Sequence, residues 1–191
     1  MKTYLLLALA AASLTATSCK KDDPESSLPP ATQEGKNTAG CLINGEQFVA
    51  TGYGSGLGKV EGVGGGFAFD SAYYLRLNGR FGNREGSLHL FLNAFPRFKN
   101  RALVGKYALN KNTPYMPAAL SDRCQSYATF FPNDNQREVF GTTADFVGNV
   151  QITYVNENNR IAAGTFEFTA VSNLDPSKTI RVTSGRFDRQ Q

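Results

Sequence analysis

The chain has 191 residues, a formal net charge of +4, one histidine, three cysteines and no tryptophan. Its mild, scattered charge gives no indication of nucleic-acid binding. The sequence contains no zinc-ligand spacing, no phosphate-binding loop and no nucleophile elbow, so it predicts neither a metal nor a cofactor, and no enzyme activity.

The amino terminus has the pattern of an export signal. Lys2 precedes an apolar run over residues 4–14, which is shorter than the ~20 residues that a membrane-spanning helix requires. Small residues then lead to Cys19, in a pattern that resembles a bacterial lipobox. We therefore expect cleavage of residues 1–18 and lipidation of Cys19, which would anchor the protein to a membrane. An ordinary signal peptide with an unmodified Cys19 is the alternative.

The next segment, residues 19–38, is expected to be a flexible tether. It contains three prolines and many small polar residues, and it has too little apolar surface to offset the entropy of ordering it. The remaining residues, 39–191, have the size of one domain. If Cys19 is lipidated, two cysteines are left in an oxidising compartment, and we expect a disulfide between Cys41 and Cys124. Two separate buried thiols are the alternative.

Alternation of apolar and polar residues indicates that this domain is all-β. Clear alternation covers 67–81, 87–95, 150–155, 164–170 and 179–188, and weaker segments are 41–43, 46–51, 103–109, 124–131 and 138–143. Asn44-Gly45 is a strong hairpin signal. About nine or ten strands predict an antiparallel β-sandwich, and a lipocalin-like closed barrel is the alternative, because periodicity alone does not separate them.

A glycine-rich stretch, residues 52–66, fits no phosphate-binding motif and is expected to be a long mobile hairpin loop. A contact loop or lid at the mouth of the domain is its functional interpretation. Aromatic side chains that could stack on a sugar would have to be tyrosines here. Tyr53, Tyr74 and Tyr115 are the candidate ligand contacts, and core packing is the alternative role for the aromatic residues.

Three segments together resemble an uncharacterised family of Bacteroidota-type lipoproteins that is known only as a domain of unknown function. They are TQEGKNTAGCLINGEQF (32–48), VQITYVNENNRIAAGTFEFTAV (150–171) and VTSGRFD (182–188). The resemblance implies an envelope location and a β-rich fold, and it transfers no catalytic residues. Residues 20–23 also resemble the surface-export signal of such lipoproteins, which implies that the domain faces the cell exterior.

These observations favour a lipoprotein of the outer membrane with a binding or structural role. A recognition module for a glycan or a protein partner would need an exposed aromatic or apolar patch beside the 52–66 loop. A lipocalin-like carrier of a small apolar ligand would need a closed barrel with an open cavity. A hydrolase, the least favoured reading, would need converging carboxylates, or a serine near His89, in one cleft.

Overall fold

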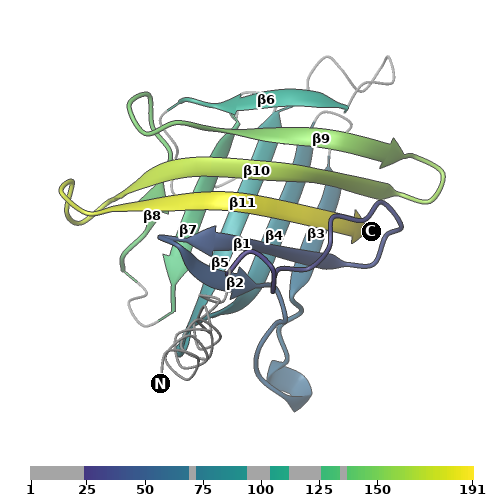
Figure 1. Cartoon of the computed structure of the whole chain (residues 1–191), viewed down its shortest axis with the longest axis horizontal. Coiled ribbons are helices and arrows are strands. Elements are labelled where there is room, and N and C mark those ends of the chain that lie inside the picture. The colour runs from purple at the N-terminus through teal and green to yellow at the C-terminus, as the bar shows by residue number, and fades with distance from the viewer. Residues whose placement is uncertain (1–23, 69–71, 94–103, 112–125, 134–136) are drawn as a thin grey trace, which may run out of the picture.

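The computed structural model describes residues 24–68, 72–93, 104–111, 126–133 and 137–191 (Figure 1). These ranges hold eleven strands and one short 3-10 helix, η1 (Gly56–Gly58). The strands are β1 (Thr38–Ile43), β2 (Glu46–Val49), β3 (Val63–Ala68), β4 (Ala72–Phe81), β5 (Arg84–Asn93), β6 (Gly105–Leu109), β7 (Tyr127–Pro132), β8 (Phe140–Gly141), β9 (Gly148–Asn156), β10 (Ile161–Ser172) and β11 (Thr179–Gln190).

Eight of these strands form a closed antiparallel barrel. Their order is β11-β1-β2-β4-β5-β7-β8-β10, and β10 pairs back with β11 to complete the ring. Three strands extend it, since β3 pairs with β4, β9 with β10, and β6 with β9. The all-β class is confirmed, and the barrel named as the alternative is the architecture present, in place of the sandwich.

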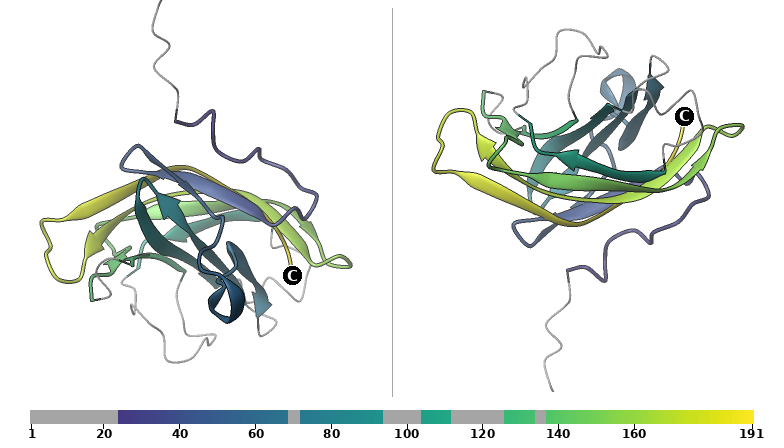
Figure 2. Two further views of the ribbon diagram at one scale, coloured as in Figure 1. Left: turned by 90° about the horizontal axis from the view of Figure 1, so that it is seen from below. Right: turned by 90° about the horizontal axis from the view of Figure 1, so that it is seen from above.

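The barrel is flattened into two layers. Strands β1, β9, β10 and β11 form one layer, and β3, β4, β5 and β7 form the other; the two sets cross at a steep angle (Figures 1 and 2). The short strands β2 and β8 close the corners, and β2 meets β4 only through Phe48↔Phe81 and Val49↔Arg80. Sandwiches and flattened barrels share one inward apolar face per strand, so alternation did not distinguish them.

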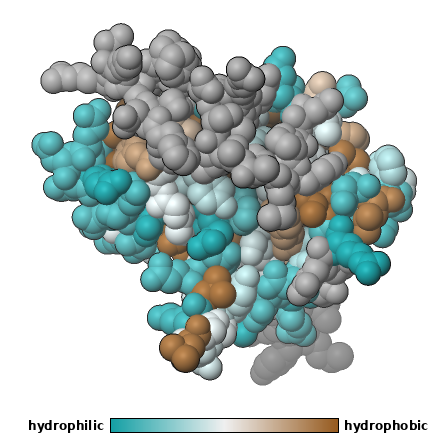
Figure 3. Space-filling model, turned by 180° about the vertical axis from the view of Figure 1, so that it is seen from behind, coloured by the Kyte–Doolittle hydropathy of each residue, from teal (hydrophilic) through white to brown (hydrophobic). Residues whose placement is uncertain are grey.

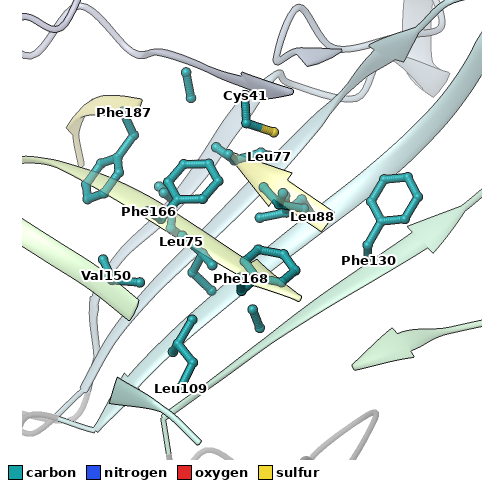
Figure 4. Packing of buried hydrophobic residues seen from close by; sticks show 14 of the residues in the cluster. Cys41, Leu75, Leu77, Leu88, Leu109, Phe130, Val150, Phe166, Phe168 and Phe187 are labelled. Atoms are coloured by element: carbon teal, nitrogen blue, oxygen red, sulfur yellow. The ribbon is translucent and has the colours of Figure 1, made fainter. Parts of the chain in front are cut away.

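Side chains fill the space between the layers. The inward tyrosine and leucines of β4 and β5 are at most 1% exposed, and the inward phenylalanines of β10 and β11 pack against the same cluster (Figure 4). The predicted alternation is therefore confirmed for 72–81, 87–93 and 164–170, and residues 69–71 and 94–95 of the predicted segments lie outside the described residues. Large side chains of this core cluster with almost no exposure include Tyr73, Phe48, Phe130, Leu75, Leu77, Leu88, Leu90 and Leu92. Phe91 is equally buried, but it belongs to a separate cluster on the outer face.

Two turns show how local chemistry sets the register. Asn44 and Gly45 both have positive φ, 52° and 81°, as a two-residue hairpin turn requires, so the predicted β1–β2 hairpin is confirmed. The prediction of a loop over 52–66 is wrong for its last residues, because Val63 to Gly66 belong to β3. At Gly65, where φ is 94°, a Cβ atom would collide with the carbonyl oxygen of Tyr74, so the strand needs a glycine there.

The structured part of the chain begins before the expected boundary at residue 39. Leu28 is only 6% exposed, and the carboxylate of Asp188 on β11 holds the segment that follows. It accepts hydrogen bonds from Thr32 Oγ1 at 2.6 Å and from the backbone N–H groups of Glu34, Gly35 and Lys36 at 3.0, 2.8 and 3.2 Å. Residues 28–37 thus form a strap on the barrel, and the flexible tether expected over 19–38 does not extend through them.

Candidate functional site

The residues predicted to carry function fall partly inside the described ranges. Cys19, Tyr115 and Cys124 lie outside the described residues. Tyr53 and Tyr74 are both half-buried, and both lie on the outer face of the layer formed by β3, β4, β5 and β7. Figure 3 looks at the molecule from this side, and apolar and polar residues are interspersed over the part of the face that is not drawn in grey.

Cys41 is a buried thiol of the core. Its side chain is 0% exposed among the apolar residues that line the barrel, and burial raises the pKa of the thiol far above its ordinary value (Figure 4). It is a free cysteine in this structure. Cys124 lies outside the described residues, so the disulfide between Cys41 and Cys124 stays a prediction. Cys41 acts here as a small apolar core residue, for which a buried thiol is well suited.

Tyr74 belongs to an oblique row of rings that crosses β4, β5 and β7. Its ring centroid lies 5.6 Å from that of His89, which in turn lies 4.9 Å from that of Phe131. The three side chains are half-buried, so each presents part of its ring to the surface. Each of β4, β5 and β7 contributes one ring to this row on the outer face. The pairing of the three strands brings these rings together although they are separated in the sequence. We call Tyr53, Tyr74, His89 and Phe131 the aromatic band.

Tyr53 joins the band through a polar network. Its hydroxyl lies 3.2 Å from Ser87 Oγ, and Ser87 is the residue directly opposite Phe131 in the β5–β7 pair. Ser87 Oγ donates to Asn78 Oδ1 at 2.8 Å. Hydroxyl and amide groups thus lie beside the rings, and the exposed Arg76 faces His89 across the β4–β5 pair. Rings flanked by hydrogen-bonding groups are suited to ligands that have both apolar and polar surfaces.

The loop that carries Tyr53 is held at its base. Asn78, which is 2% exposed, accepts the N–H of Gly52, donates its own N–H to the carbonyl of Gly62, and donates Nδ2 to the carbonyl of Glu61. Tyr53 and Val60 add a reciprocal backbone pair. The expectation of a loop that is mobile throughout is therefore wrong at its base. Its tip, with η1, projects from the barrel (Figure 1) and carries the fully exposed Leu57.

His89 is the titratable member of the band. The sequence places it on the outer face, which is confirmed, but it is half-buried rather than fully exposed. Burial, and secondarily the positive charge of Arg76, lowers the pKa of His89 to about 4. At neutral pH the ring is uncharged, so it presents an imidazole that can stack and accept or donate a hydrogen bond.

We expect this pKa to make stability depend on acid. The unfolded chain protonates His89 near pH 6.5, whereas the native state resists protonation down to about pH 4. The free energy of unfolding is therefore unaffected by protonation of His89 above pH 6.5 and falls as the pH drops toward 4. The expected loss is about 3 kcal/mol. Urea denaturation at pH 7, 5.5 and 4.5 should show that the difference in unfolding free energy between the wild type and the His89→Gln variant changes with pH. Parallel stability curves would contradict the shifted pKa.

No metal centre is apparent in the described ranges. Within them, no three His, Cys, Asp or Glu side chains come together in a way that could hold a metal ion. The same ranges contain no helix with the length and apolar character needed to cross a bilayer. Comparisons of the chain with protein-family models, with curated proteins and with solved structures found no match.

Sequence reasoning found part of this site. Tyr53 and Tyr74 were candidate contacts from the sequence, whereas Phe131 carried no signal of its own and His89 was a candidate only as a residue that a hydrolase site would need. Their grouping depends on the β4–β5–β7 register, which places Tyr74 diagonal to His89 and His89 diagonal to Phe131. The sequence did indicate that His89 lies on the outer face, because it alternates with the apolar residues Leu88 and Leu90.

Proposed function

We propose that this protein is a lipid-anchored recognition protein of the bacterial envelope that binds a glycan through the aromatic band. The observation that carries the proposal is the row of half-buried rings, with centroids 4.9 and 5.6 Å apart, on one face of the sheet. Aromatic rings can stack on the apolar faces of sugar rings, while the neighbouring Ser87, Arg76 and the hydroxyl of Tyr53 can hydrogen-bond sugar hydroxyl groups.

A glycan is favoured over a protein partner because of how the apolar surface is distributed. The large hydrophobic residues exposed in the described ranges are Leu57, Val104, Val147 and Leu174, which come from four separate segments. Protein-binding patches are contiguous and larger than a few hundred Å². The band is narrow and alternates with polar side chains, which is the pattern that suits a sugar chain.

The anchoring part of the proposal rests on the amino-terminal sequence. The export signal, Cys19 and the acidic and basic residues after it support a lipoprotein of the outer membrane whose domain faces the exterior, as does the resemblance to Bacteroidota-type lipoproteins. The chain already contacts the barrel at Glu25, whose carboxylate pairs with Arg186 at 2.9 Å, so the short segment between Cys19 and Glu25 would be the length of chain available to hold the barrel away from the lipid.

Native gel electrophoresis in the presence of polysaccharides tests the binding proposal. The purified protein is run in gels that contain laminarin, xylan or galactomannan, and we expect at least one of them to retard it. The Tyr74→Ala/Phe131→Ala double variant should lose the retardation, with binding about tenfold weaker for each ring removed. The matched control is Tyr154→Ala, which removes a half-buried tyrosine from β9 in the other layer.

Two results would contradict this function. No retardation by any of the three polysaccharides would argue against a glycan ligand. Equal retardation of the wild type and the double variant would place the ligand elsewhere on the molecule. If the double variant instead loses capture of a defined protein from envelope extracts, with no glycan binding by the wild type, the band is a protein-binding surface.

A further inference from the structure

A second feature, at one end of the barrel, is independent of the aromatic band. A hollow of about 650 Å³ opens between the β1–β2 turn, the ends of β4 and β7, strand β8 and the β10–β11 loop. Its floor is apolar, and it is formed by Ile43, Phe81, Phe130, Phe140 and Ile180. None of residues 52–66 lines it, so the glycine-rich loop is not its lid. The volume is typical of a small-molecule site, and barrel ends are common places for one.

The rim of the hollow carries two ion pairs from different elements. Arg84 Nη2 donates to Glu46 Oε2 at 3.2 Å, and Lys178 Nζ lies 3.7 Å from Glu138 Oε1. The second distance exceeds that of a hydrogen bond. Both pairs are at least partly exposed, so each contributes little to stability and can be exchanged for another partner at small cost.

The cations and the carboxylates of the rim are not equally available. Glu138 is 12% exposed at its side chain, and its Oε1 accepts a hydrogen bond from Ser172 Oγ at 2.8 Å, so this carboxylate is fixed in the wall. Arg84 and Lys178 have side chains that are 53% and 60% exposed. The guanidinium carbon of Arg84 lies 4.3 Å from the centroid of the Phe81 ring, so this cation stands directly over the apolar floor.

We propose that this hollow binds a free alkyl carboxylate, with the hydrocarbon on the phenylalanine floor and the carboxylate between Arg84 and Lys178. Arg84 uses one of its N–H donors on Glu46 and can turn others toward a second carboxylate. The remainder of the barrel is filled by side chains, so the hydrocarbon occupies the end of the barrel and not its centre. A lipocalin-like cavity would instead lie at the centre of the barrel.

Calorimetric titration with a series of ligands of equal chain length tests the proposal. Decanoate, 1-decanol and decyltrimethylammonium are titrated into the purified protein below their aggregation concentrations. We expect decanoate to bind most tightly, and the affinity for shorter carboxylates to fall about threefold to fourfold with each methylene removed. Arg84→Gln and Lys178→Gln should each weaken decanoate binding about tenfold and leave decanol binding unchanged.

The matched control is Lys106→Gln, which removes an exposed cation from β6, outside the hollow. The Tyr74→Ala/Phe131→Ala variant should retain decanoate binding, which separates this site from the glycan proposal. Equal affinity for decanoate and decanol, or undiminished decanoate binding in the Arg84→Gln/Lys178→Gln double variant, would overturn the assignment of an anion. No binding of any ligand in the series would overturn the site itself.

Discussion

Replacement of Asp188 by alanine should cost about 3–5 kcal/mol of unfolding free energy at pH 7, one of the two largest effects that we expect from a single substitution. The Asp188 carboxylate is buried and accepts one hydroxyl and three backbone N–H hydrogen bonds from the strap. Alanine would leave those three N–H groups without their acceptor. Urea denaturation followed by far-ultraviolet circular dichroism measures the loss, and hydrogen exchange at Glu34, Gly35 and Lys36 should accelerate.

The pH dependence of this effect has a definite sign. Burial alone would raise the pKa of Asp188, but the hydrogen bonds from Thr32 and from the backbone N–H groups of Lys36, Glu34 and Gly35 outweigh it and lower the pKa below its ordinary value. The contribution is therefore fully present above the unfolded-state pKa of about 3.9, and it is lost as pH falls through the lower native pKa. The stability gap between the wild type and Asp188→Asn should close in that acidic range.

Asp175→Asn provides the control for Asp188. Asp175 is half-buried, and its carboxylate accepts hydrogen bonds from Ser177 within its own turn. Its replacement should leave the urea midpoint and the exchange of the strap amides nearly unchanged. Unaltered strap exchange in Asp188→Ala would show that the carboxylate does not hold this segment.

The Asp188 contact joins two segments that lie far apart in the sequence. TQEGKNT supplies the donors and GRFD supplies the acceptor, and Asn37 Oδ1 adds contacts by accepting from Arg189 Nη1 and the N–H of Gln190 at 2.7 and 3.0 Å. Gly35 has a φ of 76°, and a Cβ there would meet Gln190 Cβ at 2.9 Å. Residues that look like part of a polar tether are therefore needed for a tight chain crossing.

The sequence contained enough information to identify most strands and their buried faces. Period-two alternation located β4, β5, β10 and β11, and Asn44-Gly45 located the first hairpin. It could not locate β3, whose glycines give no alternation, or the closure of the ring through the short corner strands β2 and β8. The alternation over 150–155 predicts that Tyr154 shares a buried face with Ile152, but the β9–β10 register shifts at Ala163/Gly164, and Tyr154 is only half-buried.

The two candidate sites were harder to predict for the same physical reason. The aromatic band combines one residue each from a loop, β4, β5 and β7, and the hollow combines residues from five separate segments. No local spacing encodes such groups, because register and closure bring them together. Only Tyr53 and Tyr74 carried an individual signal, and the apolar floor residues Phe81 and Phe130 could not be told from the rest of the core before the end of the barrel was known.

Replacement of Leu75 by alanine should cost about 3–5 kcal/mol, because this side chain lies at the centre of a filled core. Leu75 is 0% exposed and belongs to the same apolar cluster as Leu77, Leu88 and Leu90 (Figure 4). In a tightly packed interior, the loss includes both the transfer free energy of the removed atoms and the cost of the new cavity. If the barrel already held an open ligand cavity, the transfer contribution of about 2.4 kcal/mol would set the upper limit.

Urea denaturation of Leu75→Ala therefore separates a filled barrel from a lipocalin-like carrier with a central cavity. Leu174→Ala, at a side chain that is 57% exposed, is the control and should change stability by less than about 0.5 kcal/mol. A new apolar cavity also binds small apolar molecules, so benzene should raise the melting temperature of Leu75→Ala and leave that of the wild type unchanged. A loss below about 2.4 kcal/mol, or benzene stabilisation of the wild type, would show that the central space is open and would return the carrier hypothesis to the interior of the barrel.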